Sequence, residues 1–284
     1  MNALRTITRQ DIRRLLPPRD PEAHKGSFGK LLLICGSVGY TGAPSLCARG
    51  ALRCGAGLVT LCVPERIYPI VAAKLEEPVI FPAPCDEAGR FSQEAAPLLL
   101  SLLASCDACL LGCGLGRSRA LDSLVETILL AAKVPLVLDA DGLNAVSGHI
   151  DVLRKTACPV ILTPHEGEFR RMGGDLSGDR VQAVQKMQKQ TGATVLLKGH
   201  RTLIFGETEA YRNETGNPGM AVGGSGDVLA GMITALLGQG LAPTDAAALG
   251  AYLHGAAGDL CRDRLGETSM TPSDLLEALP QILK

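Results

Sequence analysis

The sequence predicts an α/β fold in which a central, mostly parallel β-sheet is covered by helices on both faces. Short, continuous apolar runs alternate with segments of helical composition along most of the 284 residues. Strands that are buried on both faces of a parallel sheet have this continuous apolar character, whereas strands with one solvent-facing side alternate apolar and polar residues. The hydrophobic content of 46% is sufficient to bury such a core.

The apolar runs set the order of the expected elements. Leu31–Cys35 reads as a strand that ends at a glycine, Ala43–Cys54 as a helix, and Leu58–Val63 as a second strand that ends at a proline. After about residue 213 the pattern becomes helical. Further strands are expected at 79–81, 108–111, 136–138, 160–162, 194–197 and 202–205, and further helices at 94–105, 119–132, 148–155, 178–191, 226–238, 243–264 and 271–283.

We expect residues 1–284 to form one domain, because no linker, repeat or low-complexity segment divides the chain. Residues 95–116 carry a single charge, Asp107, over a length that could cross a bilayer. Pro97 and the central Asp107 instead divide this window into a short helix and a buried strand. Residues 1–25 lack the continuous apolar segment of a signal peptide. The sequence therefore predicts a cytoplasmic protein that does not interact with membranes.

Charge and aromatic content indicate the class of ligand. The 28 Lys and Arg residues balance 29 Asp and Glu residues, so the composition does not suggest the basic surface of a nucleic-acid-binding protein. Aromatic residues make up only 3% of the chain, which disfavours stacking platforms for single-stranded nucleic acid. A site for small molecules fits this composition better.

Most of the ten cysteines lie inside apolar runs, where they are typical of small buried side chains in a reducing compartment. Cys106, Cys109 and Cys113 have a spacing that resembles a metal or iron–sulfur motif. They lie on and around the expected strand at 108–111, and the sequence offers no evident fourth ligand nearby. We therefore interpret them as structural.

The segment from Gly216 to Asp227 is the most informative motif. It contains six glycines or prolines in twelve residues, which excludes a helix or strand interior, and the apolar residues that follow predict a buried helix. Backbone N–H groups of Gly224, Ser225 and Gly226 at such a helix start can bind a phosphate. Asp227 is either a helix cap or a general base for a hydroxyl nucleophile. The number of glycines favours the second role, and thus phosphoryl transfer to an alcohol.

Other polar motifs follow the carboxyl ends of the expected strands, where open α/β sheets bind their ligands. We expect these motifs to converge on one crevice. In chain order they are Gly36–Ala43, Gly112–Gly116, Asp139–Asn144, Thr163–Glu168 and Lys198–Thr202.

Several of these residues have more than one interpretation. Asp139 and Glu168 can hold Mg²⁺ through water, although Asp139 can equally be a turn residue. Lys198 offsets phosphate charge if a nucleotide binds beside it, and is otherwise a solvated strand-end lysine. Arg117 stands where a dinucleotide fingerprint needs its third spaced glycine, and the sequence has no Walker motif. His165 lacks the second histidine of a zincin motif.

In combination, these motifs resemble the ADP/ATP-dependent NAD(P)H-hydrate dehydratase family. The resemblance implies a ribokinase-like fold and the repair of NADH or NADPH that has been hydrated at position 6 of the nicotinamide ring. In that family's pattern, ADP or ATP phosphorylates the ring hydroxyl of the S epimer, and the phosphate then leaves. The resemblance runs in order from about Lys25 to His254, through Lys25–Lys30, Gly36–Ala43, Leu138–Asn144, Thr163–Phe169, Lys198–Gly199 and Gly216–Asp227.

The resemblance also assigns roles to single residues. Asp227 becomes the base that removes the hydroxyl proton, beside N–H groups that stabilise the transferred phosphoryl group. The hydrated dinucleotide is expected to contact Ala43, Gly116, His165 and Asp227, with Asn144 as a further candidate. The donor nucleotide is expected to contact Lys198, Gly199, His200, Arg201, Thr202 and Gly226, with Gly224 and Ser225 in the phosphate loop and with Mg²⁺ near Glu168 and Asp139.

One loop position departs from the family's pattern. Val222 stands where we expect a small polar residue such as threonine, so one hydroxyl contact to phosphate is missing. The family resemblance implies a homotetramer, and because we expect no fused epimerase domain, it also implies a separate NAD(P)H-hydrate epimerase. We interpret His254 as a packed helix histidine. The roles of Tyr40 and Thr41 stay open.

Two alternatives remain at this point. A ribokinase-like kinase of a small alcohol, such as hydroxyethylthiazole, would share the glycine-rich loop but release a stable phosphorylated product. A nucleotide-binding regulator would keep the fold without catalysis, and the presence of Asp227 argues against it.

Overall fold

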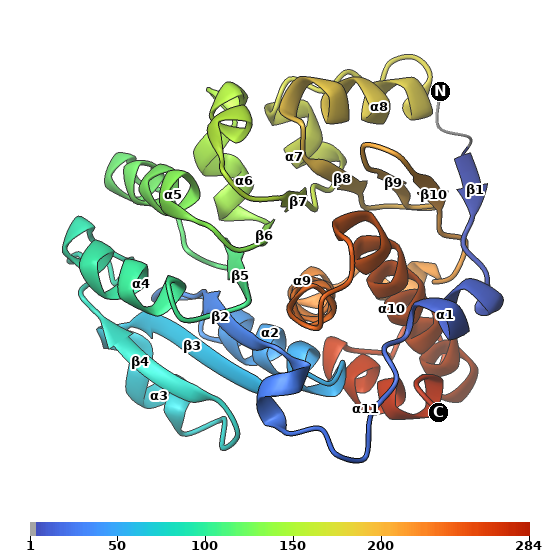
Figure 1. Cartoon of the computed structure of the whole chain (residues 1–284), viewed down its shortest axis with the longest axis horizontal. Coiled ribbons are helices and arrows are strands. Elements are labelled where there is room, and N and C mark those ends of the chain that lie inside the picture. The colour runs from blue at the N-terminus through green and yellow to red at the C-terminus, as the bar shows by residue number, and fades with distance from the viewer. Residues whose placement is uncertain (1–3) are drawn as a thin grey trace.

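The computed structural model describes residues 4–284, which form one ten-stranded sheet with helices on both faces (Figure 1). The predicted α/β fold is confirmed. The strands are β1 (Leu4–Thr6), β2 (Lys30–Ile34), β3 (Leu58–Pro64), β4 (Val79–Ala83), β5 (Ala108–Leu111), β6 (Leu136–Leu138), β7 (Val160–Leu162), β8 (Thr194–Leu197), β9 (Leu203–Phe205) and β10 (Ala210–Arg212).

The strand order across the sheet is β1-β10-β9-β8-β7-β6-β5-β2-β3-β4. All neighbours from β8 to β4 are parallel, whereas β9 runs antiparallel to both β8 and β10. β1 pairs in parallel with β10 at the edge. Across the sheet, β3 and β4 lie on one side of β2, and the next strand in the chain, β5, lies on the other side of β2. The boundary between β2 and β5 is therefore a topological switch point, where open α/β sheets bind ligands.

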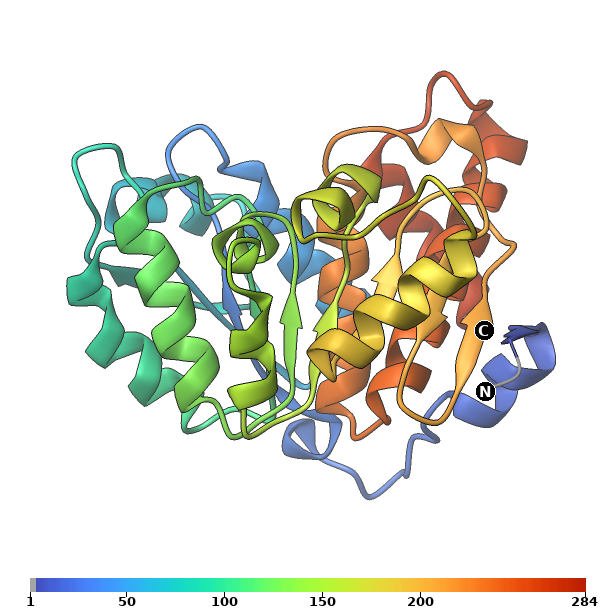
Figure 2. The ribbon, with the colours of Figure 1, turned by 90° about the horizontal axis from the view of Figure 1, so that it is seen from above.

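The helices form two layers. The structure contains α1 (Arg9–Leu15), α2 (Gly42–Arg53), α3 (Tyr68–Ala72), α4 (Ala96–Leu103), α5 (Arg119–Ala131), α6 (Asp141–Val146), α7 (Glu166–Arg171), α8 (Arg180–Thr191), α9 (Ser225–Gly238), α10 (Pro243–Leu265) and α11 (Pro272–Ile282). One face of the sheet packs against α2, α9, α10 and α11, and the other against α4, α5, α6 and α8. In Figure 2, α5 and α8 lie in front of the strands.

Successive residues of β2 supply both layers of the core. Leu31 and Leu33 pack in the cluster that contains α2 and α9, and Leu32 and Ile34 pack in the cluster on the opposite face. All four side chains are at most 1% exposed. This double burial is the physical reason for the continuous apolar run in the sequence.

Some short elements were not predicted. These are β1, β10, α1, α3, α6 and α7, and the helix expected at 148–155 is a 3₁₀ helix at Ile150–Lys155. The window at 95–116 consists of α4 and the buried strand β5, as predicted. Within residues 4–284, no helix has the length and apolarity needed to span a bilayer.

Close packing between α2 and α9 fixes the start of α9 near the switch point. A Cβ atom at Gly231 of α9 would overlap the carbonyl oxygen of Cys47 in α2, and one at Gly50 of α2 would lie 2.6 Å from the carbonyl oxygen of Val228. The two glycines let the helix backbones approach one another directly, and α9 also packs on β2 and β5. The polar first turn of α9 is thereby held near the carboxyl ends of these strands.

Candidate active site

The glycine-rich loop leads into the first turn of α9, as the sequence predicts. Gly224 has φ +96°, a left-handed conformation that favours glycine, and a Cβ atom there would lie 2.5 Å from Leu46 Cδ1. Ser225 begins the helix, and Asp227 lies in its first turn, partly exposed. The N–H groups of a helix's first turn have no acceptors within the helix, and the helix dipole makes them an anion-binding site.

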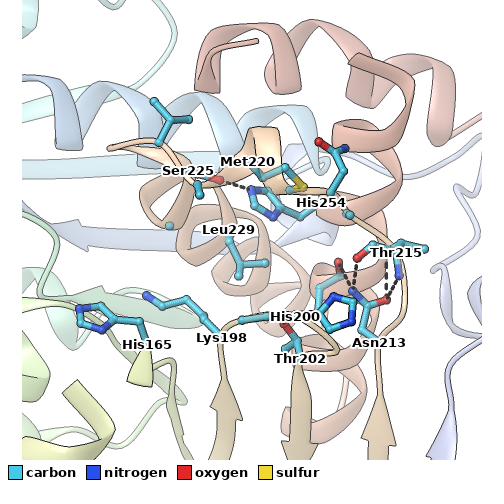
Figure 3. A pocket seen from close by; sticks show the side chains of 18 of the residues that line it. His165, Lys198, His200, Thr202, Asn213, Thr215, Met220, Ser225, Leu229 and His254 are labelled. Atoms are coloured by element: carbon cyan, nitrogen blue, oxygen red, sulfur yellow. Dashed lines mark hydrogen bonds between the residues drawn. The ribbon is translucent and has the colours of Figure 1, made fainter. Parts of the chain in front are cut away.

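A cavity of about 780 Å³ opens beside this turn, within the size range of small-molecule sites. Figure 3 shows Lys198 and His165 on one side of the cavity and Ser225 and His254 on another, with Leu229 between them. Twelve of the residues to which the sequence assigns a catalytic, binding or metal role line it: Asp139, His165, Glu168, Lys198, Gly199, His200, Arg201, Thr202, Gly224, Ser225, Gly226 and Asp227.

Lys198 lies between two buried carboxylates in this cavity. Its Nζ is 2.8 Å from Asp139 Oδ1 and 3.9 Å from Glu168 Oε2. Burial by itself would lower the pKa of Lys198, but the charges of Asp139 and Glu168 outweigh burial and raise the pKa above its ordinary value. Lys198 is therefore a fixed cation. A Cβ atom built on Gly226 would be 3.4 Å from Lys198 Nζ, so the ammonium group faces the phosphate loop directly.

Asp227 has the surroundings of a proton acceptor. Burial, and then the nearby charge of Asp139, raise the pKa of Asp227 to about 7. Asp139 itself is 1% exposed and accepts hydrogen bonds from Lys198 Nζ and from Thr163 Oγ1, each at 2.8 Å. A carboxylate whose pKa lies near neutrality can both take up and release a proton at physiological pH.

His165 is the N-cap of α7, directly after β7. Its Nδ1 accepts hydrogen bonds from the backbone N–H groups of Gly167 and Glu168, and the Glu168 side chain accepts one from the His165 N–H at 2.8 Å. This capping box holds the imidazole at the cavity wall, where its Nε2 lies 3.4 Å from Glu168 Oε1. Because Nδ1 acts as an acceptor, the neutral ring carries its proton on Nε2, which can donate a hydrogen bond.

Comparison with known proteins identifies the family. The family model described as NAD(P)H-hydrate dehydratase matches residues 31–281. The chain belongs to the NAD(P)H-hydrate dehydratase family. The bifunctional NAD(P)H-hydrate repair enzyme of Moorella thermoacetica is 45% identical over 285 residues, which cover 99% of this chain and 54% of that protein. The chain thus spans about half the length of that relative.

A relative of similar length and a solved structure agree with this result. The ADP-dependent (S)-NAD(P)H-hydrate dehydratase of Neisseria meningitidis is 39% identical over 257 residues, or 87% of this chain and 82% of that protein. The ADP/ATP-dependent NAD(P)H-hydrate dehydratase of Bacillus subtilis, co-crystallised with ATP and Mg²⁺, superposes with a TM-score of 0.86 at 31% identity, covering 99% and 98% of the two chains. The predicted family and its ribokinase-like fold are confirmed.

Asp139 and Glu168 each have a carboxylate oxygen that a hydrated cation could contact. Asp139 Oδ2 accepts a hydrogen bond from the Cys113 thiol at 3.5 Å, and it lies 4.0 Å from the position of a Cβ atom on Gly226, beside the phosphate loop. Glu168 Oε1 is 3.4 Å from His165 Nε2. Because the single charge of Lys198 is shared by both carboxylates and its ammonium group already occupies one oxygen of Asp139, the donor set fits water-mediated Mg²⁺ better than direct coordination.

Three predicted substrate residues lie outside the lining of this cavity. Gly116 N–H and Asn144 Nδ2 both donate to Asp141, at 2.8 and 3.2 Å. Ala43 lies in the first turn of α2 at the switch point, where a Cβ atom on Gly114 would lie 3.1 Å from its methyl group. These residues mark the neighbouring part of the crevice, around the carboxyl ends of β2 and β5, and their contact with substrate stays a prediction.

Sequence reasoning missed several lining residues, including Asn213, Thr215 and Gly255. Asn213 and Thr215 follow the short strand β10, which was itself not recognised. His254 was interpreted as a packed helix residue, and its side chain is indeed only 8% exposed. It also borders the cavity, and its Nε2 lies 3.3 Å from Ser225 Oγ (Figure 3). Burial lowers the pKa of His254 to about 4, so it is neutral at pH 7.

Proposed function

We propose that this protein is an ADP- or ATP-dependent dehydratase of the S epimer of hydrated NADH or NADPH. It restores the reduced dinucleotide and releases phosphate together with AMP or ADP. The observation that carries the proposal is Asp227 in the first turn of α9, between the glycine-rich loop and the Lys198 ammonium group, in a cavity of the right size. The family and the N. meningitidis and B. subtilis relatives support this substrate class.

The first step is phosphoryl transfer to the ring hydroxyl. Asp227 takes the proton of the C6 hydroxyl while the hydroxyl oxygen attacks the terminal phosphorus of the donor. The bond from that phosphorus to the leaving nucleotide then breaks. The N–H groups of the first turn of α9 stabilise the negative charge on the transferred group, and Lys198 offsets the charge of the donor phosphates. Both are pre-positioned, because Gly224 and the Asp139–Lys198 ion pair hold them.

The second step is elimination. The C6–O bond breaks with departure of phosphate, C5 loses a proton to solvent, and the electron pair of the C5–H bond forms the C5–C6 double bond. Phosphate is a far better leaving group than hydroxide, which is the chemical reason to phosphorylate first. When bound, Mg²⁺ would supply further neutralisation of phosphate charge, and we propose that Glu168 and Asp139 hold it through water.

The remaining residues divide between the two ligands in this proposal. His200, Arg201 and Thr202, with Gly199, form the donor side of the cavity after β8. His165 belongs to the acceptor side, with Asn144, Ala43 and Gly116 farther along the crevice. We also propose a homotetramer that acts together with an NAD(P)H-hydrate epimerase, and a cytoplasmic location, which the ten free thiols support.

The test is recovery of the dihydronicotinamide absorbance from purified S-NADPH hydrate in the presence of Mg²⁺ and either ADP or ATP. We expect recovery with at least one donor and stoichiometric release of phosphate. Absence of recovery with both donors contradicts the proposal. Accumulation of a stable phosphorylated product from a small alcohol, such as hydroxyethylthiazole, would instead support the kinase alternative.

The base assignment is tested by Asp227→Asn, which keeps the size of the side chain but removes its basicity. We expect kcat to fall by at least 100-fold, the lower end of the usual contribution of a general base, while nucleotide binding changes little. Asp151→Asn is the matched control, because it makes the same charge change at an exposed carboxylate outside the cavity lining. Activity of Asp227→Asn equal to that of the control would show that Asp227 is not the base.

A further inference from the structure

Three cysteine thiols meet directly behind Asp227. Cys35 follows β2, Cys113 follows β5, and Cys47 lies in α2, so the fold brings them together at the topological switch point. Their Sγ atoms all lie within 4.8 Å of one another, and each residue is 0% exposed. Cys113 is distant in sequence from Cys35 and Cys47, and this trio differs from the Cys106, Cys109 and Cys113 spacing.

The backbone around these thiols is fixed. The Gly36 N–H donates to the Cys113 carbonyl oxygen at 2.8 Å, which joins the segments after β2 and β5. The close contact of Gly231 with the Cys47 carbonyl group holds α2 in place. A tetrahedral Zn²⁺ ion has Zn–S bonds of about 2.3 Å, which places two thiolates on the same ion about 3.8 Å apart. The three thiols therefore need to move together by only about 1 Å.

A second group of possible ligands, formed by two carboxylates, shares Cys113 with the trio. Cys113 Sγ, an Asp139 oxygen and an Asp227 oxygen also lie within 4.8 Å of one another. Asp139 already accepts hydrogen bonds from Lys198 and Thr163, which makes it the less available of the two. Asp227 lines the cavity, so it also stands on the path from the cavity to Cys113. Three sulfur ligands and one oxygen ligand form a set that suits Zn²⁺ or Cd²⁺ and disfavours Mg²⁺.

We propose that Cys35, Cys47, Cys113 and Asp227 bind one thiophilic divalent cation, Zn²⁺ or Cd²⁺. On binding, the three thiols lose their protons to solvent and four bonds form to the metal, with no change in oxidation state. Bound metal occupies the Asp227 carboxylate and so inhibits the dehydratase, a consequence that rests on the proposed function. The alternative is that the three thiols are only small side chains of the core.

The binding test uses the metal alone, with no nucleotide. Tag-free protein is titrated with Co²⁺ under anaerobic reducing conditions, and Zn²⁺ is then added as a competitor. We expect a thiolate-to-cobalt charge-transfer band that saturates at one ion per chain and disappears with one equivalent of Zn²⁺. Absence of this band in the folded wild-type chain overturns the proposal.

Single substitutions locate the site. Cys47→Ala removes one thiol from a side chain with no role in the proposed reaction, and we expect Zn²⁺ affinity to fall at least 10-fold with a weaker charge-transfer band. Cys109→Ala is the matched control, because Cys109 is equally buried but packs in the core on the other face of the sheet. Circular dichroism checks the folding of both variants, and Cys35→Ser serves as a second ligand variant. Equal Zn²⁺ affinity in the wild type, Cys47→Ala and Cys35→Ser overturns the proposal.

Inhibition separates the metal site from the dehydratase activity. We expect one equivalent of Zn²⁺ to abolish turnover of the wild type, a chelator to restore it, and Cys47→Ala to need at least 10-fold more Zn²⁺. A cobalt band without dehydratase activity would support the metal site and contradict the proposed function. Dehydratase activity without a cobalt band would support the proposed function and contradict the metal site.

Discussion

Replacing His254 by glutamine tests whether a buried, neutral imidazole supports the phosphate loop. His254 projects from α10 and its Nε2 lies 3.3 Å from the Ser225 hydroxyl at the start of α9. Burial lowers its pKa from 6.5 to about 4, and the nearby charge of Lys198 adds to this shift. Glutamine keeps a group that can hydrogen-bond to Ser225 but cannot take up a proton in this range.

Whether stability rises or falls with pH depends on whether the folded or the unfolded chain protonates His254 first. As the pH falls below 6.5 the unfolded chain protonates His254, whereas the folded chain resists protonation until about pH 4. The stabilisation is therefore fully present above pH 6.5 and is lost between pH 6.5 and 4. At 1.36 kcal/mol per pKa unit, a shift of about 2.5 units corresponds to about 3 kcal/mol below pH 4, of which about 2 kcal/mol is already lost at pH 5.

Urea denaturation at pH 8 and pH 5 measures this difference. We expect the free energy of unfolding of the wild type to fall by about 2 kcal/mol more than that of His254→Gln over this interval, because all other titrating groups are shared. Parallel pH dependence of the two proteins would refute the reasoning, since it would mean that His254 titrates alike in the folded and unfolded states.

The other predictions concern charge, packing and Mg²⁺. Lys198→Met leaves Asp139 and Glu168 without their shared cation. We therefore expect the free energy of unfolding, measured with urea, to fall by about 3 kcal/mol and the KM of the donor nucleotide to rise at least 10-fold. An unchanged unfolding midpoint would contradict this. Gly231→Ala drives a methyl group into the Cys47 carbonyl oxygen and should cost about 2 kcal/mol, whereas Gly148→Ala, which meets nothing within 4 Å, should cost less than about 0.5 kcal/mol. Equal thermal stability of these two variants would show that the α2–α9 contact is not tight. EDTA should abolish turnover, excess Mg²⁺ should restore it, and turnover that persists in EDTA would remove the Mg²⁺ requirement.

Long buried elements could be predicted from the sequence, and short edge elements could not. The runs in β2 and β3 are recognisable because both faces of these strands are buried. β1 has three residues, none of them buried, and it exists because it pairs with β10 more than 200 residues later in the chain. Such pairing depends on tertiary structure and leaves no local pattern. The antiparallel direction of β9 is likewise decided by its connection to β8, not by its composition.

The candidate site was predictable where backbone geometry dictates residue type. Gly224 needs a left-handed conformation and Asp227 follows it in the first turn of a helix, so loop and helix start are visible together in the sequence. The cysteine trio was not predictable, because Cys113 packs with the layer of α2 and α9 whereas Cys109 packs on the opposite face of the sheet. A linear spacing of cysteines carries no information about which face each one occupies.

The contact between α2 and α9 has a consequence for biosynthesis. Gly50 precedes its partner on α9, Val228, by 178 positions in the chain, and Asp227 lies on that late helix. During translation, the face of α2 that will receive α9 stays uncovered until most of the chain has left the ribosome. Because the closing of the core and the position of Asp227 both depend on α9, a nascent chain whose core is closed already holds this carboxylate in place.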